Sequence, residues 1–387
     1  MILSFNPHGT YHVGENTYLN KTEAAYQSSM QRKPMHWDFH TDVYSKFDWT
    51  KRPPGTIKEH YKNRAQQIRD SYDHVVIPFS GGMDSYTVLH SFLSNNIHVD
   101  EIWTNWPLKQ IKYQPVCTTE RDEMNILSEY KYAVLPVLEY VRKNFPKTNI
   151  VINDYSEEFH GEFTEHQVKL ATTWQSPSSH HRGQGRSDLC DAALKQNKRV
   201  ARVYGFDKIK LRVTNNQLYA FFTDHFGSGE ITTGEVAEFF YHSPNAPLIP
   251  ILQAHCLKDA LASRTLVELD PTSYVDGLWA IGERGLLNVL YMEVCYPDFP
   301  KDTFQTGKPM GTLIRKSDLW LKDYSPRFYN SWKWVYDQYF NSLDDKLLQK
   351  VDDTVVGLNY YASGNYLVAD NFKCREFDFS PNVIRST

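Results

Sequence analysis

A loop between a short apolar run and a helical stretch carries the strongest structural signal in this sequence. The apolar run His74–Phe79 (HVVIPF) is typical of a buried strand in a parallel sheet, and the residues Ser80–Ser85 (SGGMDS) follow it directly. Glycines let backbone amides approach an anion, and the first turn of a helix presents unpaired N–H groups at its positive dipole end. Ser80 and Ser85 add hydroxyl donors, and Asp84 adds a carboxylate suited to hold Mg²⁺ beside phosphate oxygens. The segment therefore predicts a phosphate-binding loop.

Predicted strands and helices alternate around this loop. The further strands and helices are expected, in chain order, at residues 85–94, 99–104, 119–144, 149–153, 187–198 and 200–204. Such alternation predicts an α/β fold with a parallel, twisted sheet, flanking helices and right-handed crossovers. After the last of these strands, Asn215-Asn216 between two apolar runs predicts a β-hairpin.

Three regions follow from these patterns. Residues 1–70 are expected to be an N-terminal extension with a hairpin near residues 10–19 and a helix opened by the capping box Thr56–Glu59. Residues 71–225 are expected to form the nucleotide-binding domain around the loop. Residues 226–387 are expected to be a mainly helical C-terminal region that serves the substrate or an accessory role.

Two common phosphate-binding motifs, GxxxxGK[ST] and GxGxxG after a strand, are absent from the sequence. The segment SGGMDS instead resembles the PP-loop, SGGxDS, of the ATP pyrophosphatase superfamily, which includes asparagine synthetase, GMP synthetase, argininosuccinate synthetase and several tRNA-modifying enzymes. The resemblance covers this motif together with the strand before it and the helix after it. It implies an adenine nucleotide alpha hydrolase-like fold, with ATP and Mg²⁺ as ligands. The alternative is a plain glycine-rich turn.

The resemblance also implies a reaction and a set of site residues. In that superfamily ATP is cut between its α and β phosphates, and an adenylated substrate passes to a nucleophile. The residues that match the motif, and so are expected to bind the pyrophosphate portion of ATP, are Ser80, Gly81, Gly82, Asp84 and Ser85. Among them Asp84 is expected to be a Mg²⁺ ligand and a catalytic residue. Met83 occupies the variable position, where its amide is expected to contribute to binding and its side chain to pack.

A second part of the site is expected where the strand 200–204 ends. Gly205-Phe206-Asp207-Lys208 resembles weakly the glycine-acidic segment of asparagine synthetase-like proteins, with Asp-Lys where that family has Asp-Glu. Gly205 is expected to contact the nucleotide, Asp207 to be a second, catalytic Mg²⁺ ligand, and Lys208 to neutralise the pyrophosphate leaving group. An exposed ion pair in a turn is the alternative.

Other segments are candidates for contacts to the nucleotide or the substrate. Trp103 and Asn105 close the strand where this superfamily seats adenine, although Trp103 equally suits packing in the core. The loop His180–Arg186 concentrates hydrogen-bond donors beside glycines and is either a cover over phosphates or a solvated loop. Glu238–Pro244 and Phe304–Lys308 are expected to be exposed functional segments.

The amino-acid composition narrows the classes of ligand and partner that we expect for this protein. With 42 Lys and Arg against 46 Asp and Glu, the net charge of −4 does not favour a nucleic-acid-binding surface, although a local basic patch remains possible. The five cysteines lack any CxxC spacing, which argues against a zinc or iron–sulfur site and favours a reducing compartment. No apolar stretch approaches the roughly 18 residues of a membrane span, and no signal peptide is evident. We therefore expect a cytoplasmic protein.

These observations leave three hypotheses. The first is an AMP- and pyrophosphate-forming ligase of the asparagine synthetase type, which adenylates a carboxylate or carbonyl of a small molecule or nucleoside before attack by a nitrogen nucleophile. The second is a nucleic-acid or tRNA base-modifying enzyme that aminates or thiolates through an adenylated intermediate. The third is a non-catalytic adenine nucleotide-binding module. The sequence opens without the nucleophilic cysteine of a glutaminase, so ammonia or sulfur is expected to come free or from a separate donor protein.

Overall fold

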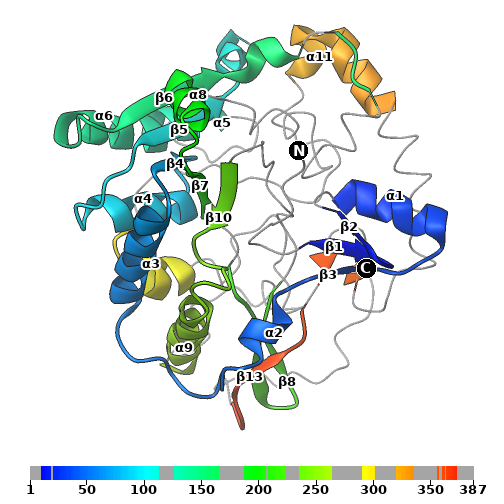
Figure 1. Cartoon of the computed structure of the whole chain (residues 1–387), viewed down its shortest axis with the longest axis vertical. Helices are drawn as coiled ribbons and strands as arrows, with labels where there is room; N and C mark the ends of the chain where they lie inside the picture. The colour runs from blue at the N-terminus through cyan, green and yellow to red at the C-terminus, as the bar shows by residue number, and fades with distance from the viewer. Residues whose placement is uncertain are drawn as a thin grey trace.

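The computed structural model describes the chain from residue 10 to residue 372 with gaps. The described residues are 10–18, 21–112, 126–159, 161–164, 187–205, 208–222, 235–263, 290–300, 320–334, 355–356, 360–361 and 363–372. A five-stranded parallel sheet with helices on both faces forms the centre of the molecule (Figure 1). This architecture confirms the predicted α/β class.

The central sheet has the strand order β10-β7-β4-β5-β6. Its strands are β4 (His74–Pro78), β5 (Glu101–Trp106), β6 (Asn149–Asp154), β7 (Val200–Tyr204) and β10 (Glu235–Phe239). The chain starts in the middle at β4, builds outward through β5 and β6, and then returns to the other side of β4 with β7 and β10. The connection after β4 therefore leads to one side of the sheet, and the connection after β7 leads to the other. Parallel sheets bind ligands where two neighbouring connections diverge in this way, outside the carboxyl ends of the strands.

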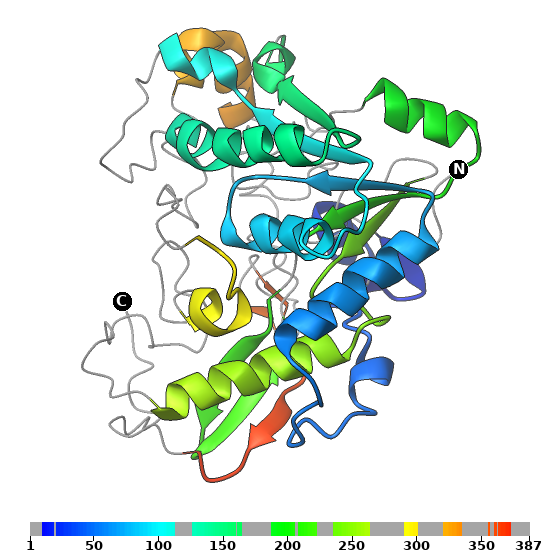
Figure 2. The same cartoon turned by 90° about the vertical axis from the view of Figure 1, so that its left-hand side faces the viewer.

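Successive side chains of β4 point to opposite faces of the sheet, and their packing partners show which helices cover each face. Val75 and Ile77 of β4 belong to the large core cluster that one group of helices covers. These helices are α3 (Ile57–Ser71), α4 (Met83–Leu93), α6 (Leu135–Asn144) and α9 (Leu248–Ser263). On the opposite face, Val76 packs in a separate cluster with Cys190 and Ala193 of α8 (Asp188–Lys195). Figure 2 shows α3, α4 and α9 stacked along one side of the sheet.

Two local sequence signals are confirmed in detail. Thr56 caps α3: its hydroxyl accepts a hydrogen bond from the Glu59 amide, and the Glu59 carboxylate accepts one from the Thr56 amide at 2.7 Å. The predicted hairpin joins β8 (Lys210–Thr214) and β9 (Gln217–Phe221), and Asn215 and Asn216 have φ angles of 53° and 58°. Positive φ at both central positions is the geometry of the type I′ turn that an Asn-Asn pair favours.

Smaller elements surround the central sheet. The N-terminal extension contains the predicted hairpin, within a sheet of order β2-β1-β3, and the β8–β9 hairpin joins β13 in a second antiparallel sheet. The remaining elements are β1 (Tyr11–Val13), β2 (Asn16–Tyr18), α1 (Lys21–Gln31), β3 (Met35–Trp37), α2 (Thr41–Tyr44), the 3-10 helix Leu108–Lys112, α5 (Ile126–Glu129), the π-helical turn Tyr130–Val134, the 3-10 helix Tyr155–Glu158, the π-helical turn Tyr291–Cys295, α11 (Leu321–Tyr324), β11 (Val355–Val356), β12 (Tyr360–Tyr361) and β13 (Tyr366–Ala369).

The sequence prediction missed the strand β10. This strand pairs in parallel with β7, so the central sheet continues beyond residue 225, where the nucleotide-binding domain was expected to end. The described parts of the C-terminal region hold strands as well as helices, and a mainly helical region is not confirmed. In the described part of the chain, no helix combines the length and the apolar composition that a membrane span requires.

The buried side chain of His242 connects the segment after β10 with the antiparallel sheet of β8, β9 and β13. The His242 ring stacks on Phe222 with 4.1 Å between ring centroids, beside Tyr44 of α2. Its Nε2 atom is buried and has no hydrogen-bond partner among the described residues. Burial in this aromatic environment, followed by repulsion from His40 and Lys210, lowers the pKa of His242 to about 3.

The low pKa of His242 predicts acid-sensitive stability. Below the ordinary histidine pKa of 6.5 the unfolded chain takes up a proton that the folded imidazole does not bind. The free energy of unfolding should therefore fall by about 2 kcal/mol between pH 7 and pH 5 through this residue alone. Urea unfolding at the two pH values should show that His242→Phe loses about 2 kcal/mol less than the native protein. An identical loss in both proteins would contradict a neutral, buried His242.

Candidate functional site

The loop between β4 and α4 has the backbone geometry that its glycines predict. Gly81 has a φ angle of 78°, and a Cβ atom there would lie 2.7 Å from Val134 Cγ2. Only glycine fits this position without displacing the neighbouring π-helical turn. Gly82 is the residue that precedes the first turn of α4, and it has no side chain to cap the helix. The first amide groups of α4 therefore face the carboxyl edge of the sheet, where they are suited to an anion.

The two serines of the loop lie together. The Ser80 amide donates to Ser85 Oγ at 3.2 Å, and the Ser85 hydroxyl donates to the Gly82 carbonyl at 3.1 Å. The two hydroxyl oxygens are 3.2 Å apart. These contacts close the loop on itself and bring both hydroxyl groups to the start of α4. The sequence pattern thus corresponds to one compact structural unit.

The end of β7 packs directly on this unit. A Cβ atom on Gly205 would lie 2.8 Å from the backbone carbon of Asp84 and 2.9 Å from its carbonyl oxygen. A glycine is therefore required where the chain leaves β7, because any side chain would push it away from α4. This close approach brings together the two sequence segments that were expected to form parts of one site.

Asp84 lies at the centre of the site and is held by two distant residues. Lys208 Nζ lies 3.0 Å from Asp84 Oδ2, and the Tyr296 hydroxyl donates to Asp84 Oδ1 at 2.7 Å. The Lys208 side chain is 6% exposed and the Asp84 side chain is 31% exposed. The ammonium group of Lys208 also lies over the rings of Tyr291 and Tyr296, at 5.5 and 5.8 Å from their centroids. A buried cation is thus fixed beside the loop.

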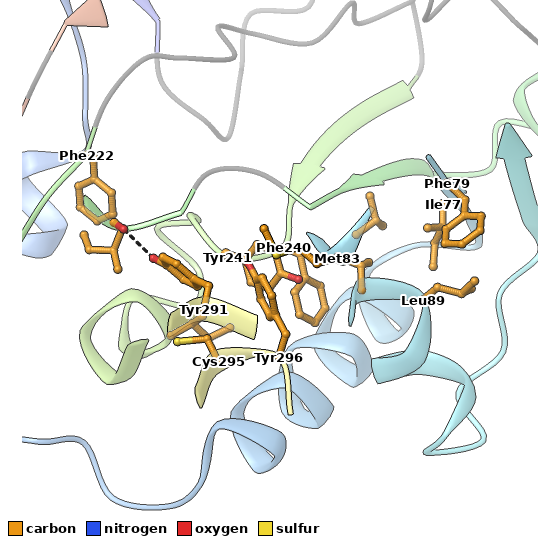
Figure 3. Close-up of a cluster of buried hydrophobic side chains, with 14 of the residues drawn as sticks. Ile77, Phe79, Met83, Leu89, Phe222, Phe240, Tyr241, Tyr291, Cys295 and Tyr296 are labelled. Atoms are coloured by element: carbon orange, nitrogen blue, oxygen red, sulfur yellow. Dashed lines mark hydrogen bonds between the residues drawn. The ribbon is translucent and has the colours of Figure 1, made fainter. Parts of the chain in front are cut away.

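Three tyrosines that the sequence analysis did not identify form one wall of the site. Figure 3 shows Tyr241 beside Tyr291 and Tyr296, which both come from one later segment of the chain. The Tyr241 hydroxyl donates to the Asp84 carbonyl at 2.9 Å, and the Tyr291 hydroxyl donates to the Ile209 carbonyl at 2.6 Å. Burial, and then the Asp84 charge, raises the pKa of both Tyr241 and Tyr296. These two hydroxyl groups therefore stay protonated as donors to Asp84.

Tyr241 lies in the segment Glu238–Pro244, which was expected to be exposed and functional. That expectation is wrong for exposure, because Glu238 and His242 are each 3% exposed. Glu238 forms an ion pair with Arg64 of α3 at 2.6 Å. The segment contributes to the site through the Tyr241 hydroxyl alone. No motif marks the segment that supplies Tyr291 and Tyr296.

The side chain of Trp103 points away from the site. It is 3% exposed, packs in the cluster beneath α8, and its ring lies under the Arg202 guanidinium at 4.5 Å. The Trp103 indole N–H donates to Glu101 at 3.1 Å. The core-packing alternative therefore describes this side chain, while the Trp103 carbonyl accepts a hydrogen bond from Phe79 and ties β5 to the loop. Asn105 is half-buried, further along β5 toward its carboxyl end.

The remaining candidates lie outside the described residues. They are Asp207, the loop His180–Arg186 and the segment Phe304–Lys308. In the described part of the chain, no group of three His, Cys, Asp or Glu side chains is arranged to hold a metal ion. Among the described residues of the site, Asp84 provides the carboxylate at the loop, which suits Mg²⁺ bound through one or two carboxylates together with phosphate oxygens. Loop amides, two hydroxyl groups and a buried lysine fit a polyphosphate.

Comparisons of this chain with protein-family models, with curated protein sequences and with solved structures find no match. The chemistry of the site follows from its own residues. It combines an anion-binding helix start, one buried cation and one carboxylate at the carboxyl edge of a parallel sheet. This combination suits a ligand that carries several negative charges together with a divalent cation.

Proposed function

We propose that this chain is an ATP pyrophosphatase-type ligase with a PP-loop fold, which forms AMP and pyrophosphate and resembles asparagine synthetase. The observation that carries the proposal is the convergence of Gly205 and Lys208 on Asp84 at the start of α4. A glycine-rich turn with no ligand has no need of a buried lysine beside it. The site also lies between β4 and β7, where the strand order reverses.

Each residue has a role in the proposed reaction. The amides and hydroxyl groups of Ser80–Ser85 hold the β and γ phosphates of ATP. A substrate carboxylate or carbonyl oxygen attacks the α-phosphorus, the bond from that phosphorus to the bridging oxygen breaks, and Lys208 neutralises the negative charge of the departing pyrophosphate. Asp84 would hold Mg²⁺, which would supply further charge neutralisation at the phosphates. The tyrosine wall excludes water, so that a nitrogen nucleophile takes the adenylated substrate.

Other parts of the proposal rest on the sequence alone. Asp207 as a second Mg²⁺ ligand, Asn105 and the β5 backbone as contacts to adenine, and a separate ammonia donor remain predictions. Base modification of a nucleic acid uses the same adenylation step, and the described residues offer no feature that favours it over a small substrate. A non-catalytic nucleotide-binding module has no use for a cation placed to neutralise pyrophosphate, and Lys208 therefore favours an enzyme.

The identity of the products tests this function. Incubation with ATP, Mg²⁺ and pools of carboxylic acids, amides and nucleosides should release AMP and pyrophosphate in equal amounts, separated by anion-exchange chromatography. Asp84→Asn should release neither, because it removes the charge that holds Mg²⁺ with little change in volume. Release of ADP and phosphate would contradict the proposal. Binding of ATP without any AMP in every pool would favour the non-catalytic module.

A further inference from the structure

The ion pair between Asp84 and Lys208 is arranged asymmetrically. The Asp84 side chain is about a third exposed, while Lys208 is almost fully buried behind it. An incoming ligand therefore meets the carboxylate before it meets the ammonium group. A cation is attracted at this point, and an anion that arrives alone is repelled.

Lys208 is also already engaged by Asp84. A polyphosphate that takes Lys208 as its counter-charge must draw the ammonium group away from Asp84 Oδ2, which lies 3.0 Å from it. The Asp84 carboxylate would then stay close to a highly charged anion without a cation of its own. The two like charges would repel each other, which is costly even though water reaches the partly exposed carboxylate. A divalent cation on Asp84 removes this cost.

We propose that Asp84 is an internal counter-ion that makes the loop selective for the magnesium complex of a polyphosphate over the metal-free polyphosphate. With Mg²⁺ the carboxylate transfers from Lys208 to the metal, and Lys208 becomes available to a phosphate oxygen. Without Mg²⁺ the carboxylate retains Lys208 and opposes the anion. This inference rests on the proposed function and adds to it a residue that determines which form of the nucleotide enters.

Tyr296 is the positioning residue in this arrangement. Its hydroxyl donates to Asp84 Oδ1 at 2.7 Å and leaves the other oxygen directed at Lys208. Tyr61 of α3 provides a matched control, since it is a buried tyrosine outside the site whose hydroxyl accepts a hydrogen bond from Gln253 at 2.9 Å. Loss of the Tyr296 hydroxyl should loosen the carboxylate, while loss of the Tyr61 hydroxyl should leave it in place.

Calorimetric titration with pyrophosphate, in EDTA or in excess Mg²⁺ at constant ionic strength, tests the inference. The native protein should bind pyrophosphate at least about tenfold more tightly with Mg²⁺ than without it. Asp84→Asn should bind metal-free pyrophosphate about tenfold more tightly than the native protein does, and Mg²⁺ should no longer improve its affinity. Thermal unfolding of the free proteins verifies that the variant is folded.

The possible outcomes separate this inference from the proposed function. If Asp84→Asn binds metal-free pyrophosphate no better than the native protein, the counter-ion role is wrong while the phosphate site stands. If the native protein binds pyrophosphate under neither condition, both proposals are overturned. Should Asp84→Asn fail to fold, Tyr296→Phe decides: its metal-free affinity should rise about threefold, and that of Tyr61→Phe should not. Equal affinities in the two tyrosine variants would overturn the role of Tyr296 and the counter-ion with it.

Discussion

Lys208→Met is expected to lower the rate of AMP and pyrophosphate formation by about 10²–10³-fold, the usual effect of removing one fixed group that stabilises developing charge. Methionine keeps much of the length and apolar stem of lysine and can still pack between Tyr291 and Tyr296. The substitution therefore removes the positive charge with little loss of packing. Asp84 is a third exposed, so water can solvate its carboxylate when the lysine is absent.

Steady-state assays of AMP release, with thermal unfolding of each variant, measure this effect. Lys198→Met is the matched control because Lys198 is exposed and precedes the amino end of the same strand, β7, far from the loop. That variant should retain the native rate. An unchanged rate in Lys208→Met would refute the role of Lys208 as the counter-charge to pyrophosphate.

The parts of the fold that could be predicted from the sequence are those with local signals. The capping box at Thr56 and Glu59 and the Asn215-Asn216 turn are each set by residues that are close together in the chain. The glycine-rich loop after β4 is largely local as well, because its serines make their hydrogen bonds within six residues. Such features depend little on what the rest of the molecule contributes.

The candidate site required contacts that no local pattern reports. Asp84 is held by Lys208, which the sequence analysis identified, and by Tyr296, which it did not. A tyrosine on a segment without a motif gives no sign of its partner 212 positions away. Trp103 is the opposite case, a residue that was expected at the site and lies elsewhere. Its position near the end of a strand suggested a ligand contact, but the alternation of side chains along β5 places its ring under α8.

The strand β10 was missed because two of the five residues in its sequence, EVAEF, are acidic, which is unusual for a buried strand. Its two acidic residues lie on opposite faces of the sheet, and a buried arginine neutralises each of them. Glu235 pairs with Arg202 of β7 at 2.9 Å, and Glu238 pairs with Arg64 of α3 at 2.6 Å. These long-range pairs compensate the buried carboxylates of this edge strand. The pattern of one strand alone does not reveal them.

The Arg64–Glu238 pair predicts a large loss of stability from one substitution. Both side chains are less than 5% exposed, and the Tyr72 hydroxyl also donates to Glu238 at 2.6 Å. Arg64→Met leaves that carboxylate buried without its counter-charge, so the free energy of unfolding should fall by about 3–5 kcal/mol. Urea unfolding at pH 7 measures the loss, and the free energy should be largely restored when Glu238→Met is added, because the double variant buries no charge.

Arg327 offers a matched control for this prediction. It pairs with Glu162 at 2.8 Å, a distance similar to that of the buried pair, but the two side chains are 73% and 59% exposed. Arg327→Met should therefore change the free energy of unfolding by only about 0–1 kcal/mol. Comparable losses in Arg64→Met and Arg327→Met would show that burial is not what makes the first pair important. The contact between α3 and β10 would then depend on apolar packing, and the ion pair would add little to it.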